Sequence, residues 1–247
     1  FTGGEPLLRS DLEEIISMID RRSVSYVFTT GYKLTYNRAL SLKKAGLFGI
    51  AISLDSLDAK VHNAMRHNNK AYDYAIEAIK NAKKAGLYTM SQTVCTRKLL
   101  VSGEIFALAK YLKKLGIDEM RIMEPLPCGA LKDKMEEVLN EDEKEQLKQL
   151  HIIFNKDTQY PKASVFPYFE SAEQFGCGAG VQHSYVDGQG FFGPCDFIDQ
   201  TYGNILVEDI HQIWMRITKA VNGPHCQCIA KNCDRCRELP KFYKLMR

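Results

Sequence analysis

Six of the eight cysteines lie in the last 71 residues, in an arrangement that suits a metal centre. Two separated positions are followed by a dense terminal group: Cys177, Cys195, Cys226, Cys228, Cys233 and Cys236. Thiolates are soft ligands that favour zinc or iron–sulfur clusters, and both commonly take four protein sulfurs. The pattern therefore predicts a metal centre that joins distant segments, while composition alone does not choose between zinc and iron.

Disulfide bonds are the other use that these cysteines could have. The chain has the length of an enzyme, 247 residues, and shows no secretory apolar segment, which favours the reducing cytoplasm and free thiols. The net charge is only +3 and the lysines are scattered, so the composition does not indicate a nucleic-acid partner. No apolar run approaches the length of a membrane span. We therefore expect metal ligation, and neither nucleic acid nor a membrane as a partner.

A repeated pattern indicates the elements that position these residues. Three segments with helical spacing of apolar residues end at Gly46, Gly86 and Gly116, and an apolar run follows each of them. Strands are expected at residues 48–54, 88–94 and 120–123, with a further strand at 26–30. Short apolar strands that alternate with helices predict an α/β fold with a parallel sheet buried on both faces, as a barrel or an open sheet.

Binding sites in both architectures form at the carboxyl ends of the strands. One such end carries Gly3-Gly4-Glu5-Pro6, where the glycines let backbone groups approach a ligand and Glu5 can accept a hydrogen bond from an amine. Taken alone, this tetrapeptide is also typical of a tight turn.

The later part of the chain follows a different pattern. Asn140 and Glu143 form a capping box, which predicts a solvated helix to about residue 155. Glycines and prolines beyond residue 160 predict a small metal-stapled domain that begins near residue 165, in which Gly190 turns a hairpin that points Cys195 back toward Cys177.

Three motifs in combination resemble the radical S-adenosylmethionine enzymes that carry a SPASM or twitch auxiliary-cluster domain. They are Gly3-Gly4-Glu5-Pro6, Ile52-Ser53-Leu54-Asp55 and Cys177-x12-Gly190-x4-Cys195. The resemblance implies a partial (β/α)6 TIM-like barrel over residues 1–160, with its first βα unit missing. A small irregular cysteine-rich domain that binds an auxiliary cluster would follow over residues 165–247.

The resemblance also implies roles for particular residues. The segment Gly3, Gly4, Glu5 and Pro6 would bind the methionine amino group of S-adenosylmethionine, and Ser53 and Asp55 would lie near its ribose or carboxylate. Arg66 resembles a basic residue that some members use near the cofactor, although a solvated arginine at a helix end fits equally. Glu124 would face the substrate, or would be a structural carboxylate that pairs with Arg121.

The sequence departs from the family in its cysteines. The family's radical-generating 4Fe-4S cluster is held by a Cys-x3-Cys-x2-Cys loop before the Gly-Gly-Glu-Pro segment, and this sequence has no such loop. Cys95 and Cys128 are isolated and are expected to be core residues. We therefore expect the chain as given not to cleave S-adenosylmethionine, because the radical cluster would require a preceding segment.

The auxiliary domain offers six cysteines, which is enough for one complete 4Fe-4S cluster. Its expected ligands are Cys177, Cys195, Cys233 and Cys236, with Cys226 and Cys228 as substitutes or as members of a second, incomplete site.

The implied function is that of the parent enzyme, in which a 5′-deoxyadenosyl radical abstracts hydrogen from a peptide or small-molecule substrate. The auxiliary cluster would transfer electrons or bind the substrate, and a reducing electron-transfer protein would be a partner. Two alternatives remain open: a zinc-stapled structural module, which is not an enzyme, and a degenerate radical S-adenosylmethionine-like protein that acts as a partner of an active enzyme.

Overall fold

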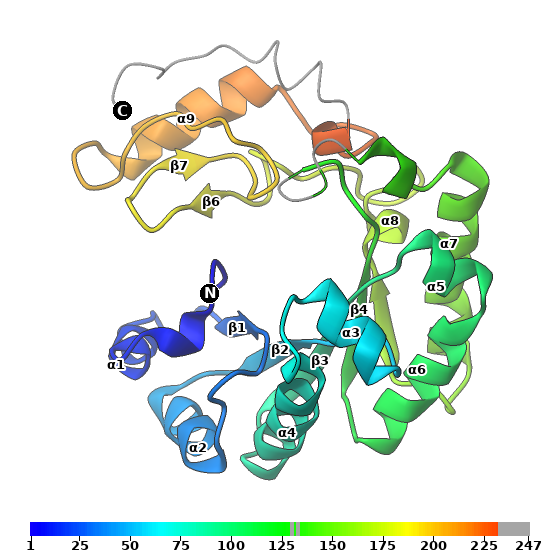
Figure 1. Ribbon diagram of the computed structural model, residues 1–247. Helices are drawn as coiled ribbons and strands as arrows, with labels where there is room; N and C mark the ends of the chain where they lie inside the picture. Colours follow the sequence, from blue (N-terminus) through cyan, green and yellow to red (C-terminus); the bar gives the residue numbers. More distant parts are fainter. Residues whose placement is uncertain (129–130, 132–133, 232–247) are drawn as a thin grey trace. The chain divides into compact units, whose positions relative to one another are not determined.

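The computed structural model describes residues 1–128, 131 and 134–231 (Figure 1). The chain forms two compact units, each with its own core. The first contains residues 1–124 and 141–166, and the second contains residues 125–140 and those from 167 onward. None of the helices in the described part of the chain is long and apolar enough to cross a membrane.

The first unit is built on a five-stranded parallel sheet whose strands follow one another in chain order. The strands are β1 (Tyr26–Thr29), β2 (Gly49–Ser53), β3 (Tyr88–Val94), β4 (Glu119–Met123) and β5 (Lys162–Val165). The predicted α/β fold is confirmed, and the four predicted strands agree with β1 to β4 to within one residue at each end. Only β5 is not predicted by the sequence pattern.

Helices connect the strands and cover the outer face of the sheet, where α2, α4 and α6 lie in Figure 1. The larger helices are α2 (Tyr36–Ala45), α4 (Ala71–Lys84), α6 (Glu104–Lys114) and α7 (Glu141–Lys156). Shorter segments are η1 (Pro6–Leu8), α1 (Leu12–Ser17), α3 (Ala59–Met65) and α5 (Arg97–Val101). Gly46, Gly86 and Gly116 end their helices with positive φ angles of 108°, 76° and 78°, as predicted.

The two faces of the sheet differ in chemistry. Residues such as Ile50, Ile52 and Ile122 point to the helices and are fully buried. Positions of opposite parity form the inner face, which includes Ser53, Gln92 and Arg121 and is only partly buried on most strands. The expectation that the strands are buried on both faces is therefore wrong except for β2, because an inner face of a partial barrel borders open space.

The helix α7 corrects a second expectation. It spans the predicted residues, but Leu147, Leu150 and Phe154 are buried and the helix packs on β5. The helix is therefore not a solvated outer element, because the unpredicted strand gives its apolar side a surface to cover.

The second unit contains little regular structure. Its elements are η3 (Met135–Glu137), α8 (Phe166–Phe169, whose first residue belongs to the first unit), β6 (Tyr185–Val186), β7 (Phe192–Gly193), α9 (Ile210–Val221) and η4 (Ile229–Lys231). The strands β6 and β7 pair as an antiparallel hairpin, and Gly190 turns between them with φ 88°. The apolar side of α9 packs in a core that also contains Cys177, Cys195 and Cys228.

Candidate functional site

The carboxylate of Glu5 fastens the Gly-Gly-Glu-Pro segment to the end of β1. Its Oε1 accepts hydrogen bonds from Thr29 Oγ1 at 2.6 Å and from the Leu7 amide at 3.1 Å. Its Oε2 accepts from the Thr30 amide at 2.8 Å and from Thr30 Oγ1 at 2.5 Å. Four donors fill the usual capacity of a carboxylate, so Glu5 is engaged within the protein. The segment therefore lies at the carboxyl edge of the sheet, as predicted from the sequence.

The two glycines before Glu5 present open backbone at this edge. A Cβ atom built on Gly3 or Gly4 meets no atom within 4 Å, and Gly3 has a φ of 112° that favours glycine. Phe1, two residues before Gly3, pairs with β1, because its carbonyl accepts from the Phe28 amide at 2.9 Å and its backbone nitrogen donates to the Tyr26 carbonyl at 2.5 Å. The backbone around Gly3 is thus anchored on both sides.

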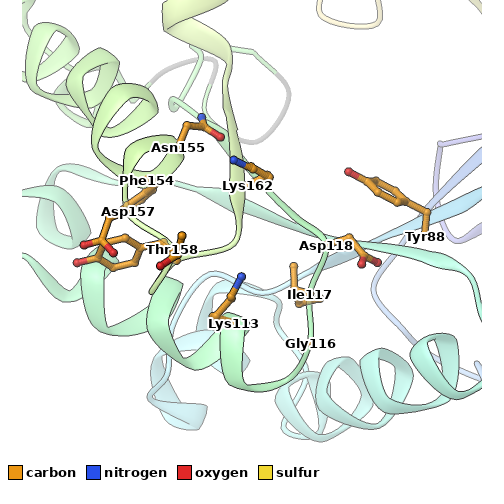
Figure 2. Close-up of a pocket in the computed structure, with 11 residues that line it drawn as sticks. Tyr88, Lys113, Gly116, Ile117, Asp118, Phe154, Asn155, Asp157, Thr158 and Lys162 are labelled. Carbon is orange, nitrogen blue, oxygen red and sulfur yellow. The ribbon is translucent and has the colours of Figure 1, made fainter.

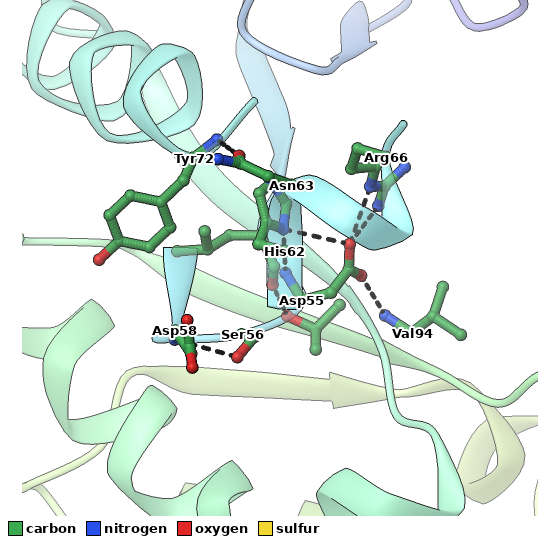
Figure 3. A network of polar contacts seen from close by, with 10 residues as sticks. Asp55, Ser56, Asp58, His62, Asn63, Arg66, Tyr72 and Val94 are labelled. Carbon is green, nitrogen blue, oxygen red and sulfur yellow. Dashed lines mark hydrogen bonds and ion pairs between the residues drawn. The ribbon is translucent and has the colours of Figure 1, made fainter. Parts of the chain in front are cut away.

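A second polar network lies at the ends of β2 and β3, around Asp55 (Figure 3). The Asp55 side chain is 1% exposed. Its Oδ1 accepts from the Val94 amide at 3.0 Å, and its Oδ2 accepts from Arg66 Nε at 2.8 Å and Nη2 at 2.7 Å. The Arg66 side chain remains 29% exposed, and Nη1 makes no hydrogen bond with the described residues. The arginine at this helix end is therefore held in place rather than freely solvated.

The imidazole of His62 completes this network as a neutral acceptor. Its Nδ1 accepts a hydrogen bond from the Asp55 amide at 3.2 Å, and it lies 3.5 Å from Asp55 Oδ2. Burial lowers the pKa of His62, with the nearby Asp55 opposing and Arg66 adding to this effect. We therefore assign the proton to Nε2, and the contact with Asp55 is not an ion pair.

The other predicted residues of the first unit lie near the same edge or in the core. Ser53 is the last residue of β2 and is partly buried on the inner face. Glu124 follows β4 and is 7% exposed, whereas Arg121 does not pair with it within the described part of the chain. Cys95 is buried in the core as expected, and burial raises the pKa of its thiol to about 12.

The opposite, amino edge of the sheet holds a pocket of about 500 Å³ (Figure 2). It is lined by residues near the starts of β3, β4 and β5, among them Tyr88, Asp118 and Lys162. Because parallel sheets bind ligands at their carboxyl edge, this pocket does not belong to the candidate site.

In the second unit, Cys177 and Cys228 adjoin each other. The Cys177 sulfur accepts hydrogen bonds from the Cys228 thiol and from the amides of Ile229 and Ala179, which lower its pKa to about 5 against the effect of burial. Burial raises the pKa of Cys195 to about 12, and the charge of Cys177 contributes to this rise. Both cysteines belong to the buried core of this unit, and the approach of Cys195 to Cys177 as a fellow ligand stays a prediction.

The described part of this unit does not complete a metal site. Cys226 is exposed, and Cys128 is half-buried with a thiol pKa that burial raises. Within residues 1–128, 131 and 134–231, no three potential ligands among Cys, His, Asp and Glu converge on one point. Cys233 and Cys236 lie outside the described residues. The amide donors around Cys177 nevertheless suit a sulfur that stays deprotonated as a ligand, which fits a metal or cluster that these two residues would help to hold.

Comparison with known proteins gives a match for the first part of the chain. Residues 1–104 match the Radical SAM superfamily. This part of the chain is similar to a radical SAM domain. This match includes Glu5, Ser53, Asp55 and Arg66, and it ends before Glu124 and before the cysteines of the second unit.

Relatives of the radical SAM domain extend the likeness further along the chain. The AdoMet-dependent heme synthase of Oleidesulfovibrio alaskensis is 25% identical over 240 residues, covering 87% of this chain and 61% of that protein. The GTP 3′,8-cyclase of Aquifex aeolicus is 30% identical over 191 residues, covering 76% of this chain and 59% of that protein. The chain thus spans about three fifths of the length of these relatives.

Solved structures show the same fold. The structure of native anSMEcpe with bound AdoMet and the Cp18Cys peptide matches 96% of this chain and 72% of its own, with a TM-score of 0.67 and 18% identity. The predicted partial barrel is confirmed by this likeness.

The sequence pattern does not indicate Gln92, and it indicates Arg121 only as a possible partner of Glu124. The two residues are register partners on the inner face of β3 and β4. Because β3 also contains Thr89, Ser91 and Thr93, and β4 also contains Glu119, polarity alone does not distinguish these two positions.

Proposed function

We propose that the chain is the S-adenosylmethionine-binding and auxiliary-cluster portion of a radical SAM enzyme that abstracts hydrogen from a peptide or small-molecule substrate. The observation that carries this proposal is the convergence at one sheet edge. The Glu5 carboxylate holds the Gly3–Gly4 backbone at the end of β1, and Asp55 holds Arg66 at the ends of β2 and β3. Backbone acceptors and a guanidinium are therefore available to one ligand that carries both an ammonium and a carboxylate.

The chemistry of S-adenosylmethionine suits these groups. The Glu5 carboxylate already accepts its full number of hydrogen bonds. We therefore assign the methionine ammonium of S-adenosylmethionine to backbone carbonyls near Gly3 and Gly4, with the charge of Glu5 close by. Its carboxylate would meet Arg66, whose fork geometry suits a two-oxygen anion. Ser53 would contact the ribose or carboxylate. Asp55 would serve the cofactor through Arg66, since its own oxygens are buried and bonded.

The second unit would hold an auxiliary 4Fe-4S cluster in a SPASM- or twitch-like domain over residues 165–247. Cys177 and Cys195, with Cys233 and Cys236, remain the proposed ligands, and the contact between Cys177 and Cys228 favours Cys228 as a further candidate. The auxiliary cluster would transfer electrons or bind the substrate. The hydrogen-abstracting radical would come from S-adenosylmethionine and a separate radical 4Fe-4S cluster, which would require a preceding Cys-x3-Cys-x2-Cys segment. Electrons would come from a reducing protein partner, and the proposed location is the cytoplasm. A substrate contact of Glu124 is likewise part of the proposal.

Binding of S-adenosylmethionine by paired variants tests the proposal. Arg66→Gln removes the proposed carboxylate partner, whereas Arg38→Gln removes a comparable guanidinium, 26% exposed and paired with Glu13 at 2.9 Å. Equilibrium dialysis with labelled S-adenosylmethionine should show an affinity that is at least tenfold weaker for Arg66→Gln, as expected for loss of a charge-assisted pair. Arg38→Gln should stay within twofold of the parent chain.

Circular dichroism of each variant establishes that it is folded, and Arg66→Lys provides a second variant that keeps the positive charge beside Asp55. An intermediate loss of affinity for Arg66→Lys would support the role of the guanidinium fork. No measurable binding by the parent chain, or equal affinity of the two glutamine variants, would contradict the proposal.

A further inference from the structure

The side chain of Arg121 occupies the inner face of the sheet between two aromatic rings. Its guanidinium carbon lies 5.0 Å from the ring centroid of Phe28 on β1 and 4.7 Å from that of Phe166, which follows β5. Cation–π contacts of this kind hold a guanidinium in place and cover its faces. Both rings belong to the same compact unit as Arg121, so this arrangement is intrinsic to the barrel part of the chain.

Among the residues that the structure describes, none satisfies the hydrogen-bond donors of this guanidinium. Arg121 makes no ion pair or hydrogen bond within the described residues, and its Nε atom is buried without a partner. Burial lowers its pKa, with the charges of Glu119 and Tyr26 opposing the shift. The carboxylate of Glu119, the nearest acid along the strand, instead accepts a hydrogen bond from Tyr88 Oη at 2.9 Å. An arginine stays charged in proteins, so these donors lack the anion that normally accompanies a buried guanidinium.

Gln92, the neighbour of Arg121 on β3, also has a buried polar atom without a hydrogen-bond partner among the described residues. Gln92 is the register partner of Arg121, which places both side chains on the inner face. The amide oxygen of Gln92 is buried and has no hydrogen-bond partner within the described residues. Two adjacent polar side chains without partners indicate that a polar ligand completes both of them.

We propose that Arg121 and Gln92 anchor an oxyanion group of the substrate inside the barrel. This inference rests on the proposed function and specifies the substrate class, namely molecules that carry a carboxylate or phosphate beside the group that reacts. Because Phe28 and Phe166 cover the faces of the guanidinium, the ligand meets its edge, where paired N–H groups match two oxygens in one plane. The Gln92 amide oxygen cannot donate to an anion, so with an oxyanion bound the amide group presents its Nε2 end at this buried position and donates one further hydrogen bond.

The anchor is tested with acetate and inorganic phosphate as probes, against sodium chloride of equal ionic strength. The parent chain labelled with ¹⁵N-arginine is titrated with each salt, and the Nε signal that is missing from Arg121→Lys is assigned to Arg121. We expect this signal to shift in a saturable manner with acetate, with phosphate, or with both, and not with chloride. The salt that gives the tighter saturation distinguishes a carboxylate source from a phosphate source.

Variants connect the signal to the site. Gln92→Leu should weaken the anion affinity obtained from the Arg121 signal about threefold, and Arg38→Gln should leave that affinity unchanged. Arg121→Met should lose the thermal stabilisation by the effective anion, while its affinity for S-adenosylmethionine stays within about threefold of the parent.

Two results would overturn the anchor, and a third would contradict the proposed cofactor site while supporting the anchor. An Arg121 signal that responds no differently from the other arginines shows that the site is absent, without bearing on cofactor binding. An Arg121→Met variant that loses S-adenosylmethionine instead assigns Arg121 to the cofactor. A parent chain that binds the anion at Arg121 but not S-adenosylmethionine supports the anchor and contradicts the proposed cofactor site.

Discussion

Arg121 on β4 contacts Phe28 on β1, although β2 and β3 lie between these strands in the sheet. Adjacent strands are about 4.8 Å apart, so a flat sheet would separate the two strands by about 14 Å. The contact at 5.0 Å therefore requires strong curvature and a side chain that crosses the inner face. The inner positions of β2, Gly49 and Ala51, are small enough to leave that crossing open.

Replacement by methionine should affect stability much more at Arg66 than at Arg121. Arg66→Met leaves the buried Asp55 carboxylate without its partner, which should lower the free energy of unfolding by about 2–3 kcal/mol, allowing for the partial exposure of Arg66. Arg121→Met removes a buried charge that has no anionic partner, and should change that free energy by no more than about 1 kcal/mol. Urea unfolding followed by circular dichroism gives both values. Equal destabilisation by the two variants would make Arg121 a structural residue.

Two glycine-to-alanine variants should separate folding from binding. A Cβ on Gly49 would lie 2.8 Å from the Tyr26 ring and 2.9 Å from the Tyr88 carbonyl, so Gly49→Ala should destabilise the chain by about 1–3 kcal/mol. A Cβ on Gly4 meets open space, so Gly4→Ala should leave the thermal midpoint within about 1 °C of the parent while weakening S-adenosylmethionine binding. A Gly4→Ala variant that binds normally would show that the ligand does not approach this backbone.

Acid should destabilise the chain in part through His62. Burial holds the pKa of His62 in the folded chain below its ordinary value of 6.5. Between these two pKa values His62 is protonated in the unfolded chain and neutral in the folded chain. Stability is therefore fully present above pH 6.5 and falls as pH decreases toward the folded pKa, by at most about 1.4 kcal/mol per pH unit. His62→Asn keeps an acceptor for the Asp55 amide but does not titrate.

The urea midpoint of His62→Asn, measured between pH 5 and 7.5, should depend less steeply on pH than that of the parent. Part of the dependence should remain, because burial also lowers the pKa of His151. Identical slopes for parent and variant would show that burial does not hold His62 neutral in the folded chain.

Metal content should depend on Cys177 and not on Cys95. After anaerobic purification we expect about four iron and four sulfide per chain, and Cys177→Ala should remove most of both. Cys95→Ala is the matched control, because Cys95 is a buried thiol in the other unit and its pKa is raised to about 12. Stoichiometric zinc without iron in the parent would favour the zinc-stapled module and would contradict the auxiliary cluster.

The elements were predictable from the sequence because local signals determine them. Gly46, Gly86 and Gly116 mark the ends of helices, and apolar runs mark β1 to β4. The short strand β5 lacks such a signal, since it has four residues and depends on pairing with β4. Because the sequence pattern does not indicate β5, it offers no strand on which the apolar side of α7 could pack. The charged sequence of this helix therefore predicts a solvated element.

The site could be placed by sequence, but its contacts could not. Motif position located Glu5 and Asp55 at the carboxyl edge, since both follow from the order of parallel strands. The partners of Glu5 are hydroxyls 24 and 25 residues away, and nothing in the pattern indicates that they saturate it. The sequence indicated Arg121 only as a possible partner of Glu124, and its place beside Gln92 and Phe28 on the inner face follows from strand register and curvature.

The saturated carboxylate of Glu5 has a consequence for the energetics of binding. Threonine hydroxyls and backbone amides already fix this loop in the protein without a ligand, so the approach of a cofactor need not order it. The conformational entropy of the Gly3–Gly4 backbone is then lost during folding instead of during association. The proposed cofactor-binding segment is therefore preorganised, and binding there would carry no penalty for ordering this backbone.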